Sequence, residues 1–316
     1  MNKLIELIKN EFQKELSEEP FHVLDLGCSG GIDVNWRSLE PYLVALGIDF
    51  NTREIERLNA TEKNKNIKYF AGNLELAPDH PIRKERGAPF VCESHKAFAK
   101  TSAWDAYSRK KKHPDTPQSN SKPEYVNLEK FLQEAGFGYV DFIKIDVDGP
   151  DFDILQALEP SLGRLQVLGL KLEVNFNGSS DPHDHTFHNM DRLMRKNGFD
   201  LYGLELRRYT KNALPGRFEG DFFGQTIKGA LAQGDALYFL NQIPPNYSQI
   251  KILKLISLMS LLDQVDSAAE LIKGLDTKSS LKQSYLDKAS QIHGFPNYKN
   301  LMETWGKNPE SFFKNS

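Results

Sequence analysis

Short apolar runs alternate with amphipathic segments along most of the chain. The runs have the length and β-branched content of buried strands, and the segments between them repeat apolar residues at helical spacing. The predicted strands are "FHVLDLG", "ALGIDF", "IKYFAGN", "YVDFIKIDVDG", "LQVLGLKLEVNF", "DLYGLELRRY" and "ALYFLNQ". The predicted helices between them are "SLEPYLVAL", Thr52 to about Asn59, "VNLEKFLQEAG", "FDILQALEPSL" and "HNMDRLMRKNG".

This alternation predicts an α/β fold with a doubly wound, mostly parallel, seven-stranded, Rossmann-like sheet. Ligands of such sheets bind at the carboxyl ends of the strands, beside the switch in strand order. The chemistry should therefore follow the last residues of the first five strands, which are Leu26, Ile48, Phe70, Ile145 and Leu172.

Three regions depart from the alternating pattern. Residues 1–19 carry the apolar stripe of an N-terminal helix, ahead of a sheet domain that we place at residues 20–242. Within that domain, residues 77–124 are irregular and contain several prolines, which indicates a loop or lid. Residues 243–316 contain amphipathic helices. We expect a C-terminal helical extension that packs on the sheet domain, on a protein partner or on a second copy of the chain.

Composition narrows the function classes. Of the 316 residues, 39% are hydrophobic and 26% are charged, which is typical of a soluble globular protein. The net charge of -3 gives no general attraction to nucleic acid, and no segment has the pattern of a transmembrane helix or signal peptide. Two cysteines in unrelated contexts exclude a disulfide framework and favour a cytoplasmic protein.

The first predicted strand ends in the glycine-rich turn "LDLGCSGG", which allows close approach of a ligand. Ser29 and Ile32 stand where a dinucleotide-binding loop needs glycines, and the lysine of a phosphate-binding loop is absent. Asp25, two residues before Gly27, would repel phosphate and suits a ligand with an ammonium group. The turn resembles the first motif of class I S-adenosylmethionine-dependent methyltransferases, with an ordinary strand-to-helix turn as the alternative.

Two polar residues follow the next strands. Asp49 is placed to accept hydrogen bonds from the ribose hydroxyls of a nucleoside, a contact that would serve NAD as well as S-adenosylmethionine. Alternatively, Asp49 caps the following helix. Asn73 either lies near the adenine or stabilises a turn.

The segment "VDFIKIDVDGPDFDIL" is the most specific in the chain. It resembles the FkbM family of methyltransferases, whose hallmark strand has the form I-K-I-D-V-E-G followed by an acidic residue. Here Asp148 replaces the glutamate, and Asp151 takes the following acidic position. The resemblance covers roughly residues 20–242. It implies a class I fold, S-adenosylmethionine as the cofactor, and a hydroxyl of a sugar, glycan or other natural product as the acceptor. The cofactor would be bound by Asp25, Gly27, Cys28, Ser29, Gly30, Asp49, Phe50, Asn73 and Asp146.

The two aspartates of the hallmark are two residues apart, so they share one face if the strand extends that far. One carboxylate would then face the cofactor's positive end, or the pair would hold a divalent ion. Alternatively, Asp148 or Asp151 caps the next helix. We predict a catalytic role for Asp146, an acceptor contact for Asp148, and no bound metal.

Candidate bases for a hydroxyl acceptor follow the fifth strand. Glu173 and Asn175 end that strand, and three histidines lie in the next loop, His183, His185 and His188. A neutral histidine suits removal of a hydroxyl proton, so we predict catalytic roles for Glu173 and the histidines and an acceptor contact for Asn175. Histidines that merely face solvent are the alternative.

Three residues of the irregular loop are candidate acceptor contacts. Trp104 and Tyr107 suit stacking on a sugar ring, and Lys111, in the basic run "SRKKKHPDTPQ", suits an anionic acceptor. The alternative is a solvated basic stretch.

The sequence thus predicts a cytoplasmic O-methyltransferase that uses S-adenosylmethionine and acts on a small-molecule or glycan acceptor. Two alternatives stay open. One is an NAD-dependent oxidoreductase on a related fold, and the other is a methyltransferase-like scaffold without catalysis, whose C-terminal helices bind a partner.

Overall fold

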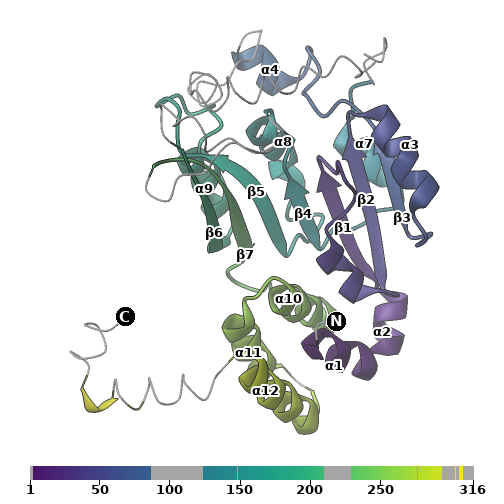
Figure 1. Cartoon of the computed structure of the whole chain (residues 1–316), viewed down its shortest axis with the longest axis vertical. Coiled ribbons are helices and arrows are strands. Elements are labelled where there is room, and N and C mark those ends of the chain that lie inside the picture. The colour runs from purple at the N-terminus through teal and green to yellow at the C-terminus, as the bar shows by residue number, and fades with distance from the viewer. Residues whose placement is uncertain are drawn as a thin grey trace, which may run out of the picture. The chain divides into compact units, whose positions relative to one another are not determined.

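The computed structural model describes residues 3–86, 124–147, 149–209, 229–275, 277–293, 303 and 306–308 (Figure 1). The chain divides into two compact units. Unit 1 consists of Met1–Phe21, Asp33–Leu43 and Ile243–Ser316, and unit 2 of His22–Ile32 and Val44–Gln242. The predicted site residues all belong to the sequence ranges of unit 2.

Unit 2 is built on a seven-stranded sheet with the strand order β3-β2-β1-β4-β5-β7-β6. The strands are β1 (Phe21–Leu26), β2 (Leu43–Asp49), β3 (Ile67–Ala71), β4 (Phe142–Ile145), β5 (Gly169–Asn175), β6 (Phe199–Tyr209) and β7 (Ala230–Leu240). The pairs β2–β3, β1–β4 and β4–β5 are parallel, whereas β7 is antiparallel to both β5 and β6. The prediction of a mostly parallel, seven-stranded α/β sheet is confirmed.

One face of this sheet carries the hydrophobic core. Apolar side chains at alternate positions of β1, β4 and β5 are fully buried, among them Leu24, Ile143 and Leu170. They pack with apolar side chains of α7 (Leu128–Glu134), α8 (Asp151–Leu158) and α9 (Phe187–Lys196). The remaining helices of unit 2 are α3 (Thr52–Thr61), α4 (Pro81–Arg86) and the short 3-10 helix η2 (Glu159–Ser161).

Along the other face, side chains change from apolar to charged toward the carboxyl ends of the parallel strands. The apolar part contains Phe142 of β4 and Phe239 of β7, with 6.2 Å between their ring centroids. Two residues further along β4 and β5, Lys144 lies opposite both Asp25 and Lys171. The charged part of this face therefore begins where the ligand site is expected.

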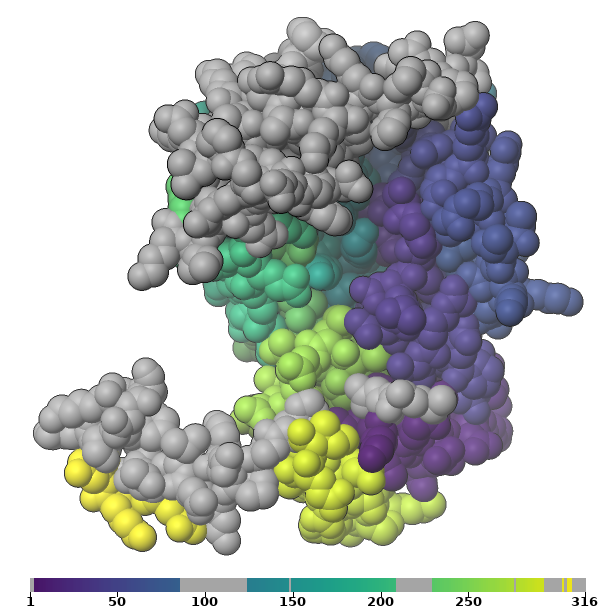
Figure 2. Space-filling model, in the orientation of Figure 1, coloured from purple at the N-terminus to yellow at the C-terminus, as the bar shows by residue number. Residues whose placement is uncertain are grey.

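Unit 1 is helical. It contains α1 (Lys3–Glu11), α2 (Gln13–Glu18), the 3-10 helix η1 (Val34–Leu39), α10 (Gln249–Leu261), α11 (Val265–Gly274) and α12 (Ser279–His293). Helix α1 packs against α10 and α12, and Figure 2 shows these first and last described helices side by side. An ion pair of 3.0 Å between Lys254 and Glu19 joins α10 to the segment after α2. None of the helices that the structure describes is long and apolar enough to span a membrane.

Two predicted elements are wrong. The helix expected at "SLEPYLVAL" is the 3-10 helix η1 followed by strand β2, which starts at Leu43. Pro41 cannot donate a backbone hydrogen bond, and Leu43 and Ala45 are buried in the sheet. The strand expected to continue to Gly149 ends at Ile145. Beyond Asp146, the N–H groups of Val147 and Gly149 donate to the side chain of Asp151 instead of to a neighbouring strand.

Candidate functional site

The glycine turn after β1 adopts a conformation that only glycine accommodates. Gly27 has a φ of +87°, and a β-carbon there would lie 1.7 Å from the carbonyl oxygen of Asp146. The Gly27 N–H donates to the carbonyl of Ile48 at 2.9 Å. The turn is therefore wedged between the ends of β2 and β4, at the switch in strand order.

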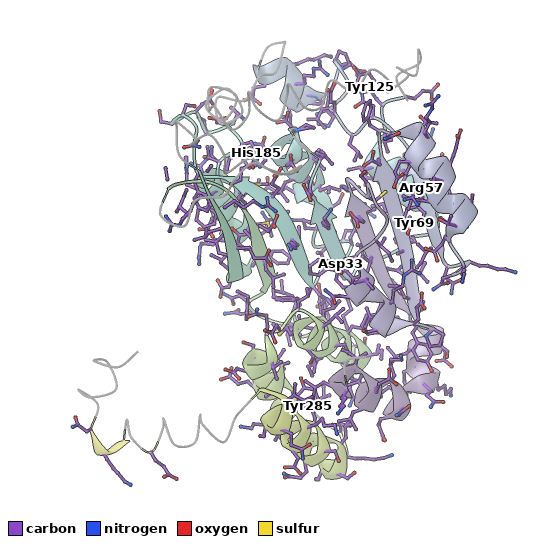
Figure 3. All side chains as sticks on the ribbon, in the orientation of Figure 1. Asp33, Arg57, Tyr69, Tyr125, His185 and Tyr285 are labelled. Atoms are coloured by element: carbon purple, nitrogen blue, oxygen red, sulfur yellow. The ribbon has the colours of Figure 1, made fainter. Side chains whose placement is uncertain are left out.

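The outer part of the turn is held by a carboxylate from α3. The N–H of Gly30 donates to Oε1 of Glu54 at 3.0 Å, and Arg57 binds both oxygens of that carboxylate at 2.6 and 2.8 Å (Figure 3). The hydrogen bond from Arg57 holds the pKa of Glu54 below its ordinary value. Ser29 and Gly30 are exposed, and a β-carbon on Gly30 would meet no atom within 4 Å. The turn thus presents rigid backbone to an open space.

The side chain of Cys28 points away from that space. A β-carbon on Gly47 would lie 2.7 Å from its sulfur, so the thiol is packed against the sheet. Burial raises the pKa of this thiol. Only the backbone of Cys28 is therefore suited to contact a ligand.

Lys144 joins the two sequence motifs. Its ammonium nitrogen lies 3.2 Å from Asp25, 3.1 Å from the carbonyl of Gly27 and 3.3 Å from Asp146. Burial disfavours the charged lysine, but the two carboxylates outweigh it and raise the pKa of Lys144 to about 12. The sequence suggested that Asp25 faces a ligand ammonium; in the structure the ammonium beside it is that of Lys144.

Asp146 is the member of this cluster that is open to a ligand. Its side chain is 40% exposed, whereas that of Asp25 is 2% exposed. Its backbone N–H donates to the carbonyl of Leu26 at 2.9 Å, which fixes it beside the glycine turn. Lys144 is the residue of this cluster that sequence reasoning missed, although it stands two positions before Asp146 and so shares its side of the chain.

The end of β2 carries Asp49 and Phe50. Oδ1 of Asp49 accepts the N–H of Asn51 at 2.8 Å, and Asn51 in turn caps α3 by accepting the N–H of Glu54. The helix cap is thus Asn51, and Asp49 orients it. Phe50 is 65% exposed, which is unusual for phenylalanine and leaves its ring accessible to a ligand.

Asn73 lies in a tight turn after β3. Its side-chain oxygen accepts the N–H of Glu75 at 3.0 Å, and its backbone forms a bridge with Tyr125. These contacts agree with the alternative that Asn73 stabilises a turn. Tyr125, which bridges to Asn73, is 45% exposed (Figure 3).

The loop after β4 is fixed from behind by Asp151. This fully buried carboxylate accepts the N–H of Val147 at 2.9 Å and of Gly149 at 3.0 Å. His185 lies 3.8 Å from it and contacts the carbonyl of Glu173 at 2.9 Å (Figure 3). Asp151 was expected as the acidic residue after the hallmark, with helix capping as an alternative, and the structure shows it supporting the hallmark loop.

The three histidines differ in accessibility. His185 is fully buried. In the tautomer whose Nε2–H donates to the carbonyl of Glu173, its Nδ1 accepts a hydrogen bond from the side-chain amide of Asn175 at 3.3 Å. His183 is half-buried and His188 is exposed. His185 is therefore enclosed in the framework, and the other two are the accessible ones.

Glu173 and Asn175 lie at the end of β5, as predicted, and both are buried. Beside Glu173 lie two residues that sequence reasoning missed, Asp235 on β7 and Arg207 on β6. Arg207 contacts Asp235 at 2.8 Å and Glu173 at 3.7 Å. Burial raises the pKa of Asp235, while the nearby Arg207 and Lys171 oppose the effect.

Four predicted acceptor contacts lie outside the described residues: Trp104, Tyr107, Lys111 and Asp148. Among the residues that are described, no group of three or more histidine, cysteine, aspartate or glutamate side chains is arranged to hold a metal ion.

Three solved structures give distant fold matches. A methyltransferase of Mesorhizobium loti is 8% identical, over 73% of this chain and 97% of that one, with a TM-score of 0.34. A TehB-like methyltransferase of Corynebacterium glutamicum is 10% identical, over 75% and 86%, with a TM-score of 0.30. A methyltransferase of Methanosarcina mazei is 11% identical, over 70% and 93%, also with a TM-score of 0.30. These likenesses are too distant to inform function, and comparison with curated proteins finds no match.

The sequence of the chain also matches a protein family. The methyltransferase FkbM domain covers residues 39–201, about half of the chain, and so includes Asp49, the hallmark strand and the three histidines. Together with the confirmed sheet, this match favours methyl transfer over the nicotinamide alternative. The chain belongs to the FkbM family of S-adenosylmethionine-dependent methyltransferases.

Proposed function

We propose that this methyltransferase acts on a hydroxyl group of a sugar, glycan or related natural product. The observation that carries the proposal is a row of carboxylates at the ligand edge of the sheet, beside the glycine turn. Asp146 and Glu173 are the residues that follow the last paired positions of β4 and β5, Ile145 and Leu172. A hydroxyl needs a base close to it as its oxygen attacks, and carboxylates in this place can accept its proton.

The residues around the turn fit the cofactor chemically. The exposed backbone of Ser29 and Gly30 can follow the methionyl part, Asp49 can accept the ribose hydroxyls, and Phe50 can cover the adenine. When bound, S-adenosylmethionine supplies an electrophilic methyl group on a sulfonium. Asp146 would face that positive charge, since it is the exposed carboxylate of the Lys144 cluster.

Lys144 and Asp151 would act as positioning residues. Lys144 neutralises Asp25 and fixes one oxygen of Asp146, so that the turn and the hallmark strand keep one geometry. Asp151 holds the loop that follows. Methyl transfer is a displacement that depends on alignment, so a rigid arrangement of this kind is itself a contribution to the rate.

On the acceptor side, Glu173 is our candidate for the base. It lies at the strand end next to Asp146, and Arg207 lies 3.7 Å from its carboxylate. His185 is assigned to positioning, because it is enclosed and bonded to the framework. His183 and His188 are the candidates for contacts with the outer part of the acceptor.

Cofactor binding is tested with Asp49→Ala and isothermal titration of S-adenosylhomocysteine. We expect the affinity to fall by about 1–3 kcal/mol, the range for losing a hydrogen-bonded charged partner. Asp200→Ala is the matched control, because Asp200 lies at the start of β6, at the opposite edge of the sheet. Unchanged affinity in Asp49→Ala would show that the ribose binds elsewhere.

Acceptor chemistry is tested by S-adenosylhomocysteine release with matched hydroxyl, amine and thiol compounds. Turnover of hydroxyl compounds supports the proposal, and turnover of amines or thiols alone refutes it. A protein that binds the cofactor product yet turns over nothing would instead support the scaffold alternative.

A further inference from the structure

The charged face of the sheet continues beyond the cofactor residues onto β7 and β6. Glu173 on β5 lies directly opposite Asp235 on β7, and Asp235 lies opposite Glu205 on β6. Two residues further along these strands, Asn175 on β5 and Arg207 on β6 both lie opposite Gln233 on β7. Side chains two residues apart on a strand share a face, so these groups project to the same side as Asp146 and Lys144.

This arrangement is costly for folding alone. Like charges directly opposite each other destabilise a sheet, and here the side chains of Glu173 and Asp235 are only 6% and 9% exposed. Among the described residues, Arg207 contacts both carboxylates, and Lys171 lies 3.9 Å from Asp235. Apolar side chains at these two positions would pack at less cost. The buried acids therefore indicate a site that is kept for a ligand.

A second, independent observation indicates what kind of ligand this is. Asn175 is 1% exposed, and its side-chain nitrogen donates to His185 at 3.3 Å. Its buried side-chain oxygen has no hydrogen-bond partner among the described residues. A buried acceptor of this kind costs free energy unless a donor reaches it.

The groups in this part of the face are mostly hydrogen-bond acceptors. The carboxylates of Glu173 and Asp235 and the oxygen of Asn175 accept hydrogen bonds, and the hydroxyls of a polyol donate them. An anionic group would meet the two buried carboxylates, and Arg207, the cation between them, is already paired at 2.8 Å. The chemistry favours a neutral, hydroxyl-rich group over an anion.

We propose that Asp235 and Arg207, together with Glu173 and Asn175, form the acceptor subsite, and that it takes a neutral sugar ring with neighbouring hydroxyls. This assignment rests on the proposed function and deepens it, because it places the acceptor beside Asp146 and excludes acidic sugars at the reacting ring. Asp235 and Arg207 are then specificity-determining residues. The anionic acceptor that the basic run around Lys111 suggested is disfavoured at this position.

The experiment measures kcat and KM for neutral methyl glycosides and for the matched uronic acids and sugar phosphates. The full chain is used, and turnover is followed by S-adenosylhomocysteine release. The wild type should prefer the neutral glycoside over its uronic acid by tenfold or more in kcat/KM. Asp235→Asn should raise the KM for the glycoside tenfold or more, narrow that preference, and leave the S-adenosylhomocysteine Kd within twofold.

Arg207→Lys is the second variant, because lysine cannot bridge two carboxylates as a guanidinium does. It should show the same pattern if Asp235→Asn fails to fold. Arg164→Lys is the matched control, since Arg164 pairs with Glu129 at the same 2.8 Å outside this face. A preference for uronic acids or phosphates, or glycoside kinetics in both variants equal to the control, overturns the assignment. Absence of turnover with every hydroxyl compound overturns the proposed function, and the assignment falls with it.

Discussion

Lys144→Met tests whether the ammonium that joins Asp25, Gly27 and Asp146 stabilises the fold as its geometry indicates. Methionine matches the length of the aliphatic part of the lysine side chain and lacks the charged ammonium with its three donors. The substitution therefore isolates the electrostatic contribution at the junction of the glycine turn and the hallmark strand.

The magnitude follows from the pKa. A value of about 12, against an ordinary 10.5, corresponds to about 2 kcal/mol of net stabilisation of the charged form. The side chain is 23% exposed, so solvent screens this contribution only in part. Removing the ammonium also takes one partner from the buried carboxylate of Asp25, so we expect a total loss of about 2–4 kcal/mol.

The pH range of the effect follows from the sign of the shift. Because the pKa of Lys144 is raised in the folded state, its contribution is fully present below about pH 10.5 and is lost as the pH rises through about 12. The difference between wild type and variant should thus stay constant between about pH 7 and pH 9.

The assay is thermal unfolding, with Lys68→Met, an exposed lysine of β3, as the control. For a chain of 316 residues, a loss of about 2–4 kcal/mol corresponds to a midpoint roughly 3–6 °C lower. The double variant Asp25→Asn, Lys144→Met should lose less than the sum of the two single losses, with a coupling energy of about 2 kcal/mol. A Lys144→Met midpoint equal to that of the control, or fully additive single losses, would falsify the assignment of this cluster.

Two further substitutions test the loops around the cofactor site. Gly27→Ala should destabilise the protein by more than about 2 kcal/mol in thermal unfolding, because its β-carbon meets the Asp146 carbonyl. Gly30→Ala, at a similar φ of +86° but with open space around it, should cost only about 1–2 kcal/mol. Equal losses would argue against the wedged turn. Asp151→Asn should cost about 1–3 kcal/mol of stability and weaken S-adenosylhomocysteine binding in titration. The reason is that an amide group cannot accept both the Val147 and the Gly149 N–H. Wild-type binding with a lowered unfolding midpoint would make the role of Asp151 purely structural.

Much of the fold was predictable because it depends on local periodicity. The strands from Phe21 to Asn175 are apolar runs that the sequence itself marks. The segment around Pro41 was mispredicted because leucines at mixed spacing fit a helix as well as a strand, and only pairing with neighbouring strands decides between them. The end of β4 at Ile145 was equally invisible, since it depends on hydrogen bonds to a side chain six residues away.

Residues of the candidate site were predictable where a sequence motif contains them. They were not predictable where the residues come from strands far apart in the sequence. Gly27, Asp49 and Asp146 lie at strand ends, as the topology requires. Asp235 lies in the middle of β7 and Arg207 near the end of β6, and β7 inserts between β5 and β6 against chain order. No local pattern shows that insertion. The burial of His185 likewise depends on contacts that its loop sequence does not reveal.

The division of unit 1 into three sequence segments bears on the order in which the protein is made. The apolar side of α1, with Leu4, Ile5 and Ile8, is buried in a unit whose other main helices, α10 and α12, are translated only after the whole sheet. At about 5–20 residues per second, the ribosome needs roughly ten to fifty seconds to pass from α1 to α10. During that interval, this apolar stripe exists on the nascent chain without either helix. Unit 1 can therefore be completed only after the whole sheet has been translated, and α1 is buried in it only after the strands that follow α1 in the chain have been made.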